Sequence, residues 1–62
     1  MDSRTILKPI KADGWYEVGK KGSHVQLKHP TKPGKVTVAH PEKDLPIGTV
    51  KSIEQQSGVK LR

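Results

Sequence analysis

Three short runs in which polar and apolar residues alternate constrain the fold of this chain more than any other feature. They are WYEVGK (15–20), SHVQLKH (23–29) and KVTVAH (35–40). Alternation with a period of two is typical of β-strands that bury one face. The connecting segments KKG and PTKPG are short enough for turns, and Pro33-Gly34 has the type II turn signature. The sequence therefore predicts a three-stranded antiparallel meander.

A helical pattern precedes these strands. Its apolar residues recur at the spacing of one helix face, and they are Ile6, Leu7 and Ile10. Ser3 is the predicted N-cap, and Gly14 is placed to end the helix in a left-handed conformation. Pro9 lacks the N–H that would bond the carbonyl of Thr5, at a cost of about 3 kcal/mol in a helix interior. We therefore expect this helix to be kinked or frayed.

A second helical pattern follows the strands. Pro46 suits its first turn, Ile47, Val50 and Ile53 form its apolar stripe, and Gly58 is placed to end it. The predicted order is therefore helix, three strands, helix. This is an α+β fold with two helices on one face of the sheet, because an antiparallel sheet can leave its other face in water. We expect one domain over residues 1–62.

Charge and composition narrow the class of partner. Twelve Lys and Arg against six Asp and Glu give a formal net charge of +6, which favours phosphate-rich partners and nucleic acid first. The absence of cysteine excludes disulfides and thiolate metal sites, and it agrees with a reducing cytoplasm. No apolar run approaches the roughly 20 residues that cross a bilayer. We expect a soluble, cytoplasmic protein without membrane contact.

Strand alternation also predicts which face each side chain occupies. The residues expected to face the helices are Tyr16, Val18, Val25, Leu27, Val36 and Val38. Those expected on the open face are Glu17, His24, Gln26, Lys28, Lys35 and Thr37. By the same alternation, the side chains of His29 and His40 are expected on the helix-facing side, at the ends of their strands and at the edge of the core. Trp15 has two readings, a base-stacking platform on the outer face or an anchor for the junction between helix and strand.

His24 is the candidate functional residue, and two interpretations stay open. It is either a solvent-exposed strand residue or a general acid/base beside the phosphate-binding lysines Lys20, Lys21, Lys28 and Lys35. The spacing does not favour a metal site, because His24 and His29 diverge on one strand. Ser23 and His24 do not form a catalytic dyad either, since adjacent strand residues point apart.

The stretches GSH (22–24), HPTKPGKVTV (29–38) and DLPIGTVKSI (44–53) together resemble the HicA toxin family, over nearly the whole chain. The resemblance implies a fold like a double-stranded-RNA-binding domain. It also implies ribosome-independent cleavage of mRNA that arrests translation, and neutralisation by a HicB antitoxin. We expect no cofactor and no metal. In this family the histidine of the GSH motif is catalytic, which here is His24. The expected RNA-binding residues are Lys20, Lys21, Gly22, Ser23, Lys28 and Lys35.

The chain departs from the family pattern at Pro9, and at Glu54 and Ser57, which occupy positions that family members more often fill with apolar residues. None of these departures touches His24. Two rival functions keep the same fold and charge: a non-catalytic RNA-binding module, and a small protein whose basic surface docks an acidic partner. Metal-dependent nuclease chemistry is disfavoured, because Glu17 is the only acidic residue assigned to the open face.

Overall fold

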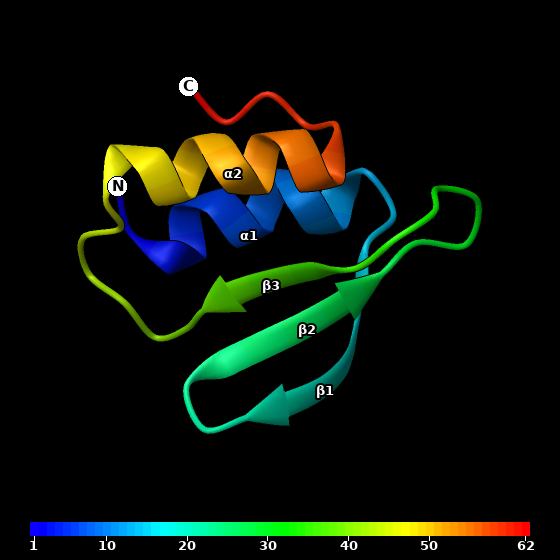
Figure 1. Ribbon diagram of the computed structural model, residues 1–62, viewed down its shortest axis with the longest axis horizontal. Coiled ribbons are helices and arrows are strands. Elements are labelled where there is room, and N and C mark those ends of the chain that lie inside the picture. The colour runs from blue at the N-terminus through cyan, green and yellow to red at the C-terminus, as the bar shows by residue number, and fades with distance from the viewer.

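Two helices cover one face of a three-stranded antiparallel sheet in the computed structural model, which describes residues 1–62 (Figure 1). The elements are α1 (Ser3–Ala12), β1 (Tyr16–Lys21), β2 (His24–Lys28), β3 (Val36–Ala39) and α2 (Ile47–Ser57). The strands follow the order β1-β2-β3, so β2 is central. This α-β-β-β-α arrangement confirms the predicted fold class. Neither helix is long and apolar enough to cross a membrane.

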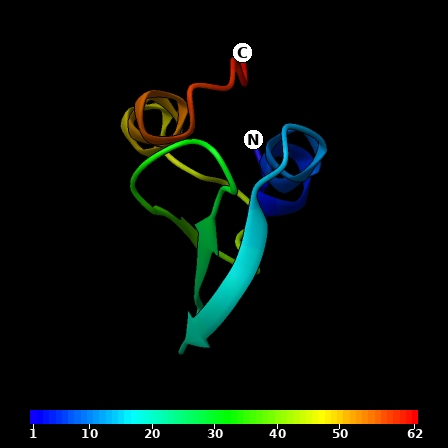
Figure 2. The same ribbon diagram turned by 90° about the vertical axis from the view of Figure 1, so that its right-hand side faces the viewer.

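The hydrophobic core lies between the helices and the covered face of the sheet. Figure 2 shows the two helices on the same side, while β1 extends beyond them. Each large aliphatic side chain buried here contributes about 1.5–3 kcal/mol relative to exposure. The buried apolar residues are Ile6, Leu7, Ile10, Trp15, Val25, Leu27, Val36, Val38, Leu45, Val50 and Ile53. The predicted inward residues of β2 and β3 and both helix stripes are thus confirmed, except for Ile47, which is exposed.

The N-terminus of α1 differs from the sequence-based expectation. Asp2 is the N-cap, and its Oδ1 accepts a hydrogen bond of 2.8 Å from the Thr5 amide. Ser3 is the first helical residue and is buried, so the prediction of Ser3 as the cap was wrong by one position. The helix does not end at Pro9 but continues to Ala12. Thr5 is exposed, so water can reach the carbonyl that Pro9 leaves without a donor.

The turn after α1 requires a glycine. Gly14 has a φ of +113°, one residue beyond the C-cap of the helix. A Cβ at this position would lie 2.7 Å from Nε2 of His29, so backbone geometry and close packing both exclude a side chain. The predicted role of this glycine in ending the helix is therefore confirmed.

The face assignment of β1 was wrong. All six of its residues are exposed, including Tyr16 and Val18, which we expected in the core. The register with β2 shifts between Glu17 and Gly19, which leaves Val18 as a bulge residue. Glu17 stands opposite Leu27 on the helix-facing side, whereas it was assigned to the open face. The reason is physical: neither helix buries the residues of this edge strand, so burial does not determine its alternation.

Trp15 takes the place that β1 leaves open in the core. It is only 2% exposed, and its Nε1 donates a hydrogen bond of 3.3 Å to the carbonyl of Ser57 at the end of α2. Its ring meets that of His29 edge to face, with the ring centroids 5.3 Å apart. The anchoring interpretation of Trp15 is therefore confirmed, and the outer-face platform is wrong.

Two valines of the sheet make a matched test of this packing. Val38→Ala removes methyl groups from a fully buried site and should lower the free energy of unfolding by an amount on the order of 2 kcal/mol. Val18→Ala makes the same change at the exposed bulge and should cost about 0.5 kcal/mol or less. Urea denaturation of both variants checks this. Equal losses would contradict the exposed bulge.

Candidate nucleic-acid interface

His24 opens the central strand of the sheet. It stands opposite Lys21 of β1 and Ala39 of β3. The next residue, Val25, points into the core, so the His24 side chain points away from the helices, as predicted. The imidazole is exposed and forms no hydrogen bond with another residue. Both ring nitrogens are therefore available to a ligand.

The turn before His24 is open to an approaching chain. Gly22 and Ser23 form a two-residue loop between β1 and β2, and Gly22 has a φ of +61°. A positive φ at the first loop residue alone is the pattern of a type II′ turn. No atom lies within 4 Å of the Cβ position of Gly22, so the surface beside this backbone is unobstructed. The Ser23 carbonyl accepts a hydrogen bond of 2.6 Å from the His40 amide, which ties the turn to the end of β3.

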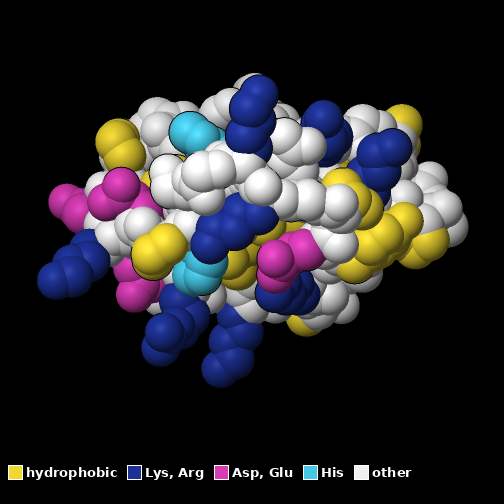
Figure 3. All heavy atoms as spheres, turned by 90° about the horizontal axis from the view of Figure 1, so that it is seen from below, with side chains coloured by type: hydrophobic (Ala, Val, Ile, Leu, Met, Phe, Trp, Pro, Cys, Tyr) yellow, Lys and Arg dark blue, Asp and Glu magenta, His cyan; other side chains and the backbone are white.

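Three of the four predicted lysines share the open face with His24. Lys21 is its cross-strand partner, Lys28 ends the same strand with the same parity, and Lys35 donates from Nζ to Oε1 of Gln26 at 3.2 Å. Lys20 does not belong to this group, because it stands opposite Val25 and lies on the helix-facing side. The predicted group of four lysines around His24 is thus reduced to Lys21, Lys28 and Lys35. Figure 3, seen from below, shows Lys and Arg side chains spread over this view, with two His side chains and several Asp and Glu side chains among them.

An aromatic residue of this face was missed at the sequence level. Tyr16 stands opposite Lys28 on the open face and is 50% exposed. The sequence did contain a signal for it, since a glycine inside a strand, here Gly19, often marks a bulge that reverses the parity of the residues before it. An exposed ring beside cations is a suitable surface for stacking an unpaired base.

The strands present no carboxylate on this face. Glu17 is the only acidic residue in the three strands, and it points to the helix-facing side. There its Oε2 accepts a hydrogen bond of 2.6 Å from Nζ of Lys11, which holds the pKa of Glu17 below its usual value. No group of three or more His, Asp or Glu side chains is arranged to hold a metal ion. The charge of the open face therefore comes from lysines alone.

The other two histidines have structural partners. Nδ1 of His29 accepts hydrogen bonds of 3.1 Å from the amides of Thr31 and Lys32. Its Nε2 therefore carries the proton, which it donates to the carbonyl of Asp13 at 2.7 Å. Nδ1 of His40 lies 2.7 Å from Oγ of Ser3. Their predicted positions at the edge of the core are confirmed, which leaves His24 as the histidine of the open face.

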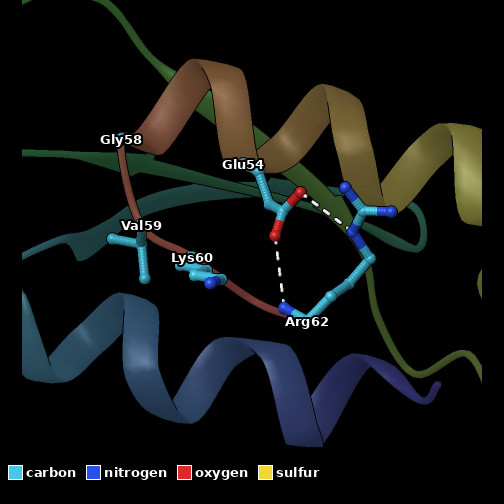
Figure 4. Close-up of a pocket in the computed structure, with 5 residues that line it drawn as sticks. All are labelled: Glu54, Gly58, Val59, Lys60 and Arg62. Carbon is cyan, nitrogen blue, oxygen red and sulfur yellow. Dashed lines mark hydrogen bonds and ion pairs between the residues drawn. The ribbon is translucent and has the colours of Figure 1, made fainter.

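The largest hollow of the surface, about 520 Å³, lies elsewhere, where the C-terminal tail passes between the helices (Figure 4). Glu54 of α2 accepts hydrogen bonds from the amides of Leu61 and Arg62 and pairs with the Arg62 side chain. The Leu61 amide is the main cause of the lowered pKa of Glu54. Oγ of the buried Ser57 accepts a bond from the Val59 amide. Glu54 and Ser57, two of the three departures from the family pattern, thus hold the tail, and this hollow has a structural origin.

The comparisons with known proteins agree with this fold. A sequence model described as HicA toxin of bacterial toxin-antitoxin matches residues 3–59. The chain belongs to the HicA toxin family. A chain in a solved "HicA3 and HicB3 toxin-antitoxin complex" is 30% identical, with a TM-score of 0.85 and 100% of both chains covered. No curated protein matches the chain. Ribonuclease activity is the known role of HicA toxins.

The position of Tyr16 on the open face generates a binding prediction. Tyr16→Ala should weaken binding of single-stranded RNA by about 1–3 kcal/mol, the value of one stacked base, while Tyr16→Phe should retain most of the affinity. Ile47→Ala, which removes another exposed apolar side chain on α2, serves as the control. Fluorescence anisotropy with labelled RNA measures all three. Unchanged affinity in Tyr16→Ala would show that no base stacks there.

Proposed function

We propose that this HicA-family toxin is a metal-independent endoribonuclease that cleaves mRNA on the open face of its sheet, with His24 as the proton-transfer group. The observation that carries the proposal is the position of His24: an exposed imidazole at the start of the central strand, on a face with lysines and no strand carboxylate. Membership of the HicA family supports the ribonuclease activity, and the exposed position of His24 among lysines supports its role in proton transfer. The same proposal places the protein in the cytoplasm, where mRNA is accessible.

The lysines of this face bind the RNA backbone. Lys21, Lys28 and Lys35 neutralise phosphates around His24, each releasing counterions from the strand. At the turn, Gly22 lets the RNA approach the backbone, and the free hydroxyl of Ser23 offers a hydrogen bond. Lys20 lies on the helix-facing side of β1, so it contacts the RNA only where the RNA passes round this edge of the sheet.

RNA supplies its own nucleophile, so a small site is sufficient. The 2′-oxygen attacks the adjacent phosphorus, the P–O5′ bond breaks, and a 2′,3′-cyclic phosphate forms. The 2′-hydroxyl loses its proton to a general base, and the leaving 5′-oxygen gains one from a general acid. His24 fills one of these two roles, because it is the histidine of this face, and proton transfer by one positioned group contributes about 10²–10⁴-fold. Lysines stabilise the extra negative charge on the phosphoryl oxygens.

The partner in this account is a HicB-type antitoxin. The solved relative is a chain of a HicA3 and HicB3 complex, and the likeness covers the whole of both chains. With a net charge of +6, this toxin presents a surface that an acidic antitoxin complements. Binding of such a partner to the open face would exclude RNA from His24.

One observation favours a second candidate, a non-catalytic RNA-binding module. A catalytic histidine is commonly oriented by a hydrogen bond from its second ring nitrogen, as in Ser-His-Asp triads. The His24 ring has no such partner in the protein. In the catalytic account the bound RNA itself orients the ring; in the alternative, His24 is only a contact and the RNA stays intact.

Incubation of the purified protein with a long single-stranded RNA in EDTA separates these functions. The parent protein should cleave the RNA, whereas His24→Ala should bind it without cleaving it. Thr37→Ala, a small change on the same face of β3, should cleave like the parent and controls for disturbance of the sheet. Circular dichroism verifies the fold of each variant.

Three results would contradict the proposal. Cleavage that EDTA abolishes would indicate a metal-dependent nuclease. Cleavage that persists at the parent rate in His24→Ala would remove this residue from the chemistry. A parent protein that shifts RNA on a gel but never cleaves it would be an RNA-binding module.

A further inference from the structure

A second cationic surface lies on the other side of the sheet from the open face. One wall is α1, which contributes Arg4, Leu7, Lys8 and Lys11, and His40 at the end of β3 closes it. These five residues line a hollow of about 340 Å³, which we call the α1 groove. A smaller hollow of about 160 Å³ shares Arg4 and His40 with it, and two carboxylates, Asp2 and Glu42, also line that hollow. None of the groove residues belongs to the interface around His24.

The cations of the α1 groove are only partly compensated. Lys11 is paired with Glu17 at 2.6 Å. Arg4 and Lys8 form neither an ion pair nor a hydrogen bond within the protein. They stand four residues apart on one helix face, where like charges destabilise a helix. A bound anion would remove this repulsion and would turn an unfavourable pair into a favourable site.

His40 adds a hydrogen-bond donor whose orientation is fixed by the fold. The hydroxyl oxygen of Ser3 accepts a hydrogen bond of 3.0 Å from the Glu42 amide. The hydroxyl proton of Ser3 then has Nδ1 of His40, 2.7 Å from the same oxygen, as its acceptor. Nδ1 of neutral His40 therefore carries no hydrogen, and Nε2 does. Nε2 of His40 has no hydrogen-bond partner in the protein. Every buried side-chain nitrogen does have a partner, so Nε2 is not buried. Because His40 lines the groove, its Nε2–H is accessible from there.

We propose that the α1 groove binds a backbone phosphate of the same RNA strand that is cleaved at His24, some nucleotides away from the scissile bond. This inference rests on the proposed function and extends its substrate site. Arg4, Lys8 and Nε2–H of His40 are the phosphate ligands. Ser3 is a positioning residue, because it sets the tautomer and direction of the imidazole.

The two sites lie at the same end of the sheet. The Ser23 carbonyl, one residue before His24, accepts the hydrogen bond from the His40 amide at 2.6 Å. His24 and Ala39 are paired, and His40 is the next residue along, so the two imidazoles leave opposite faces of the sheet. An RNA strand that passes round this end of the sheet, over the Gly22–Ser23 turn, can therefore occupy both.

The chemistry of the groove favours a phosphate over an acidic protein segment. Its donors are a guanidinium, an ammonium and an imidazole N–H, a set that suits several oxygens of one phosphate. Protein partners are usually held by aromatic or aliphatic anchors in a pocket, and Leu7 is the only apolar residue that lines this groove.

Binding measured in the His24→Ala background tests the groove without depending on catalysis. The double substitution Arg4→Gln/Lys8→Gln should weaken binding of a long single-stranded RNA. It should also make the plot of log affinity against log salt less steep by about 0.7 per lost cation. Lys51→Gln/Lys60→Gln removes the same charge from exposed positions on α2 and the tail, and it should have a smaller effect. Thermal unfolding should show no loss of stability in Arg4→Gln/Lys8→Gln.

Three results would overturn the proposal. Equal weakening by both double substitutions would mean that only net charge matters. Parent-like RNA binding by Arg4→Gln/Lys8→Gln would exclude a phosphate site. Parent-like RNA binding with reduced affinity for a HicB antitoxin would make the groove a protein-docking surface instead.

Cleavage kinetics with intact His24 give the second readout. In Arg4→Gln/Lys8→Gln, KM for long RNA should rise several-fold with kcat unchanged, while a dinucleotide substrate, too short to reach the groove, should be cleaved as by the parent. A parallel loss on the dinucleotide would contradict a site remote from the scissile bond. A parent protein that cleaves neither substrate would refute the proposed function, while the binding comparison would still decide the phosphate site.

Discussion

Every side chain of the open face takes its direction from the pairing of β2 with both neighbouring strands. Val25 and Leu27 point into the core, because a chain of 62 residues has a small core and depends on the burial of its apolar side chains. His24, Gln26 and Lys28 then point outward by parity alone. The hydrophobic effect thus positions the polar interface: the burial of two residues fixes the direction of the catalytic candidate, and the β-ladders on both sides hold it there.

Hydrogen bonds to backbone groups supplement this small core at its edges. Trp15 joins the start of β1 to the end of α2, and His29 joins the β2–β3 connection to the end of α1. Glu54 holds the C-terminal tail between the helices. The bonds of Trp15 and His29 join segments that are distant in the sequence, whereas the Glu54 bonds fold the tail back onto the helix before it. The small core is thus reinforced by polar contacts at its perimeter. Glu54 and Ser57, which deviate from the family pattern, therefore serve the fold and leave the open face unchanged.

The sequence predicted the central and covered elements well and the edge strand poorly, for one physical reason. Alternation reports the direction of a side chain only where one face is buried, as it is in β2 and β3. In β1 no helix buries the strand, and the bulge at Val18 reverses the parity of the residues before it, so Tyr16 lies on the open face and Glu17 on the other. Lys20 follows the bulge and lies on the helix-facing side, as strict alternation places it, so its grouping with the lysines of the open face was wrong. The α1 groove was invisible for another reason: it brings together a helix face and His40, which are distant in the chain and meet only through tertiary packing.

In the proposed reaction the 2′-oxygen of the RNA attacks the adjacent phosphorus beside His24, and a substrate without that oxygen isolates its role. An RNA with a single 2′-deoxynucleotide at a mapped cleavage position lacks the proposed nucleophile there and keeps every phosphate. We expect the protein to leave this bond intact and still to cleave the unmodified RNA to 2′,3′-cyclic phosphate and 5′-hydroxyl ends. Cleavage of the substituted bond, with 5′-phosphate ends, would show that water is the nucleophile and would contradict the account.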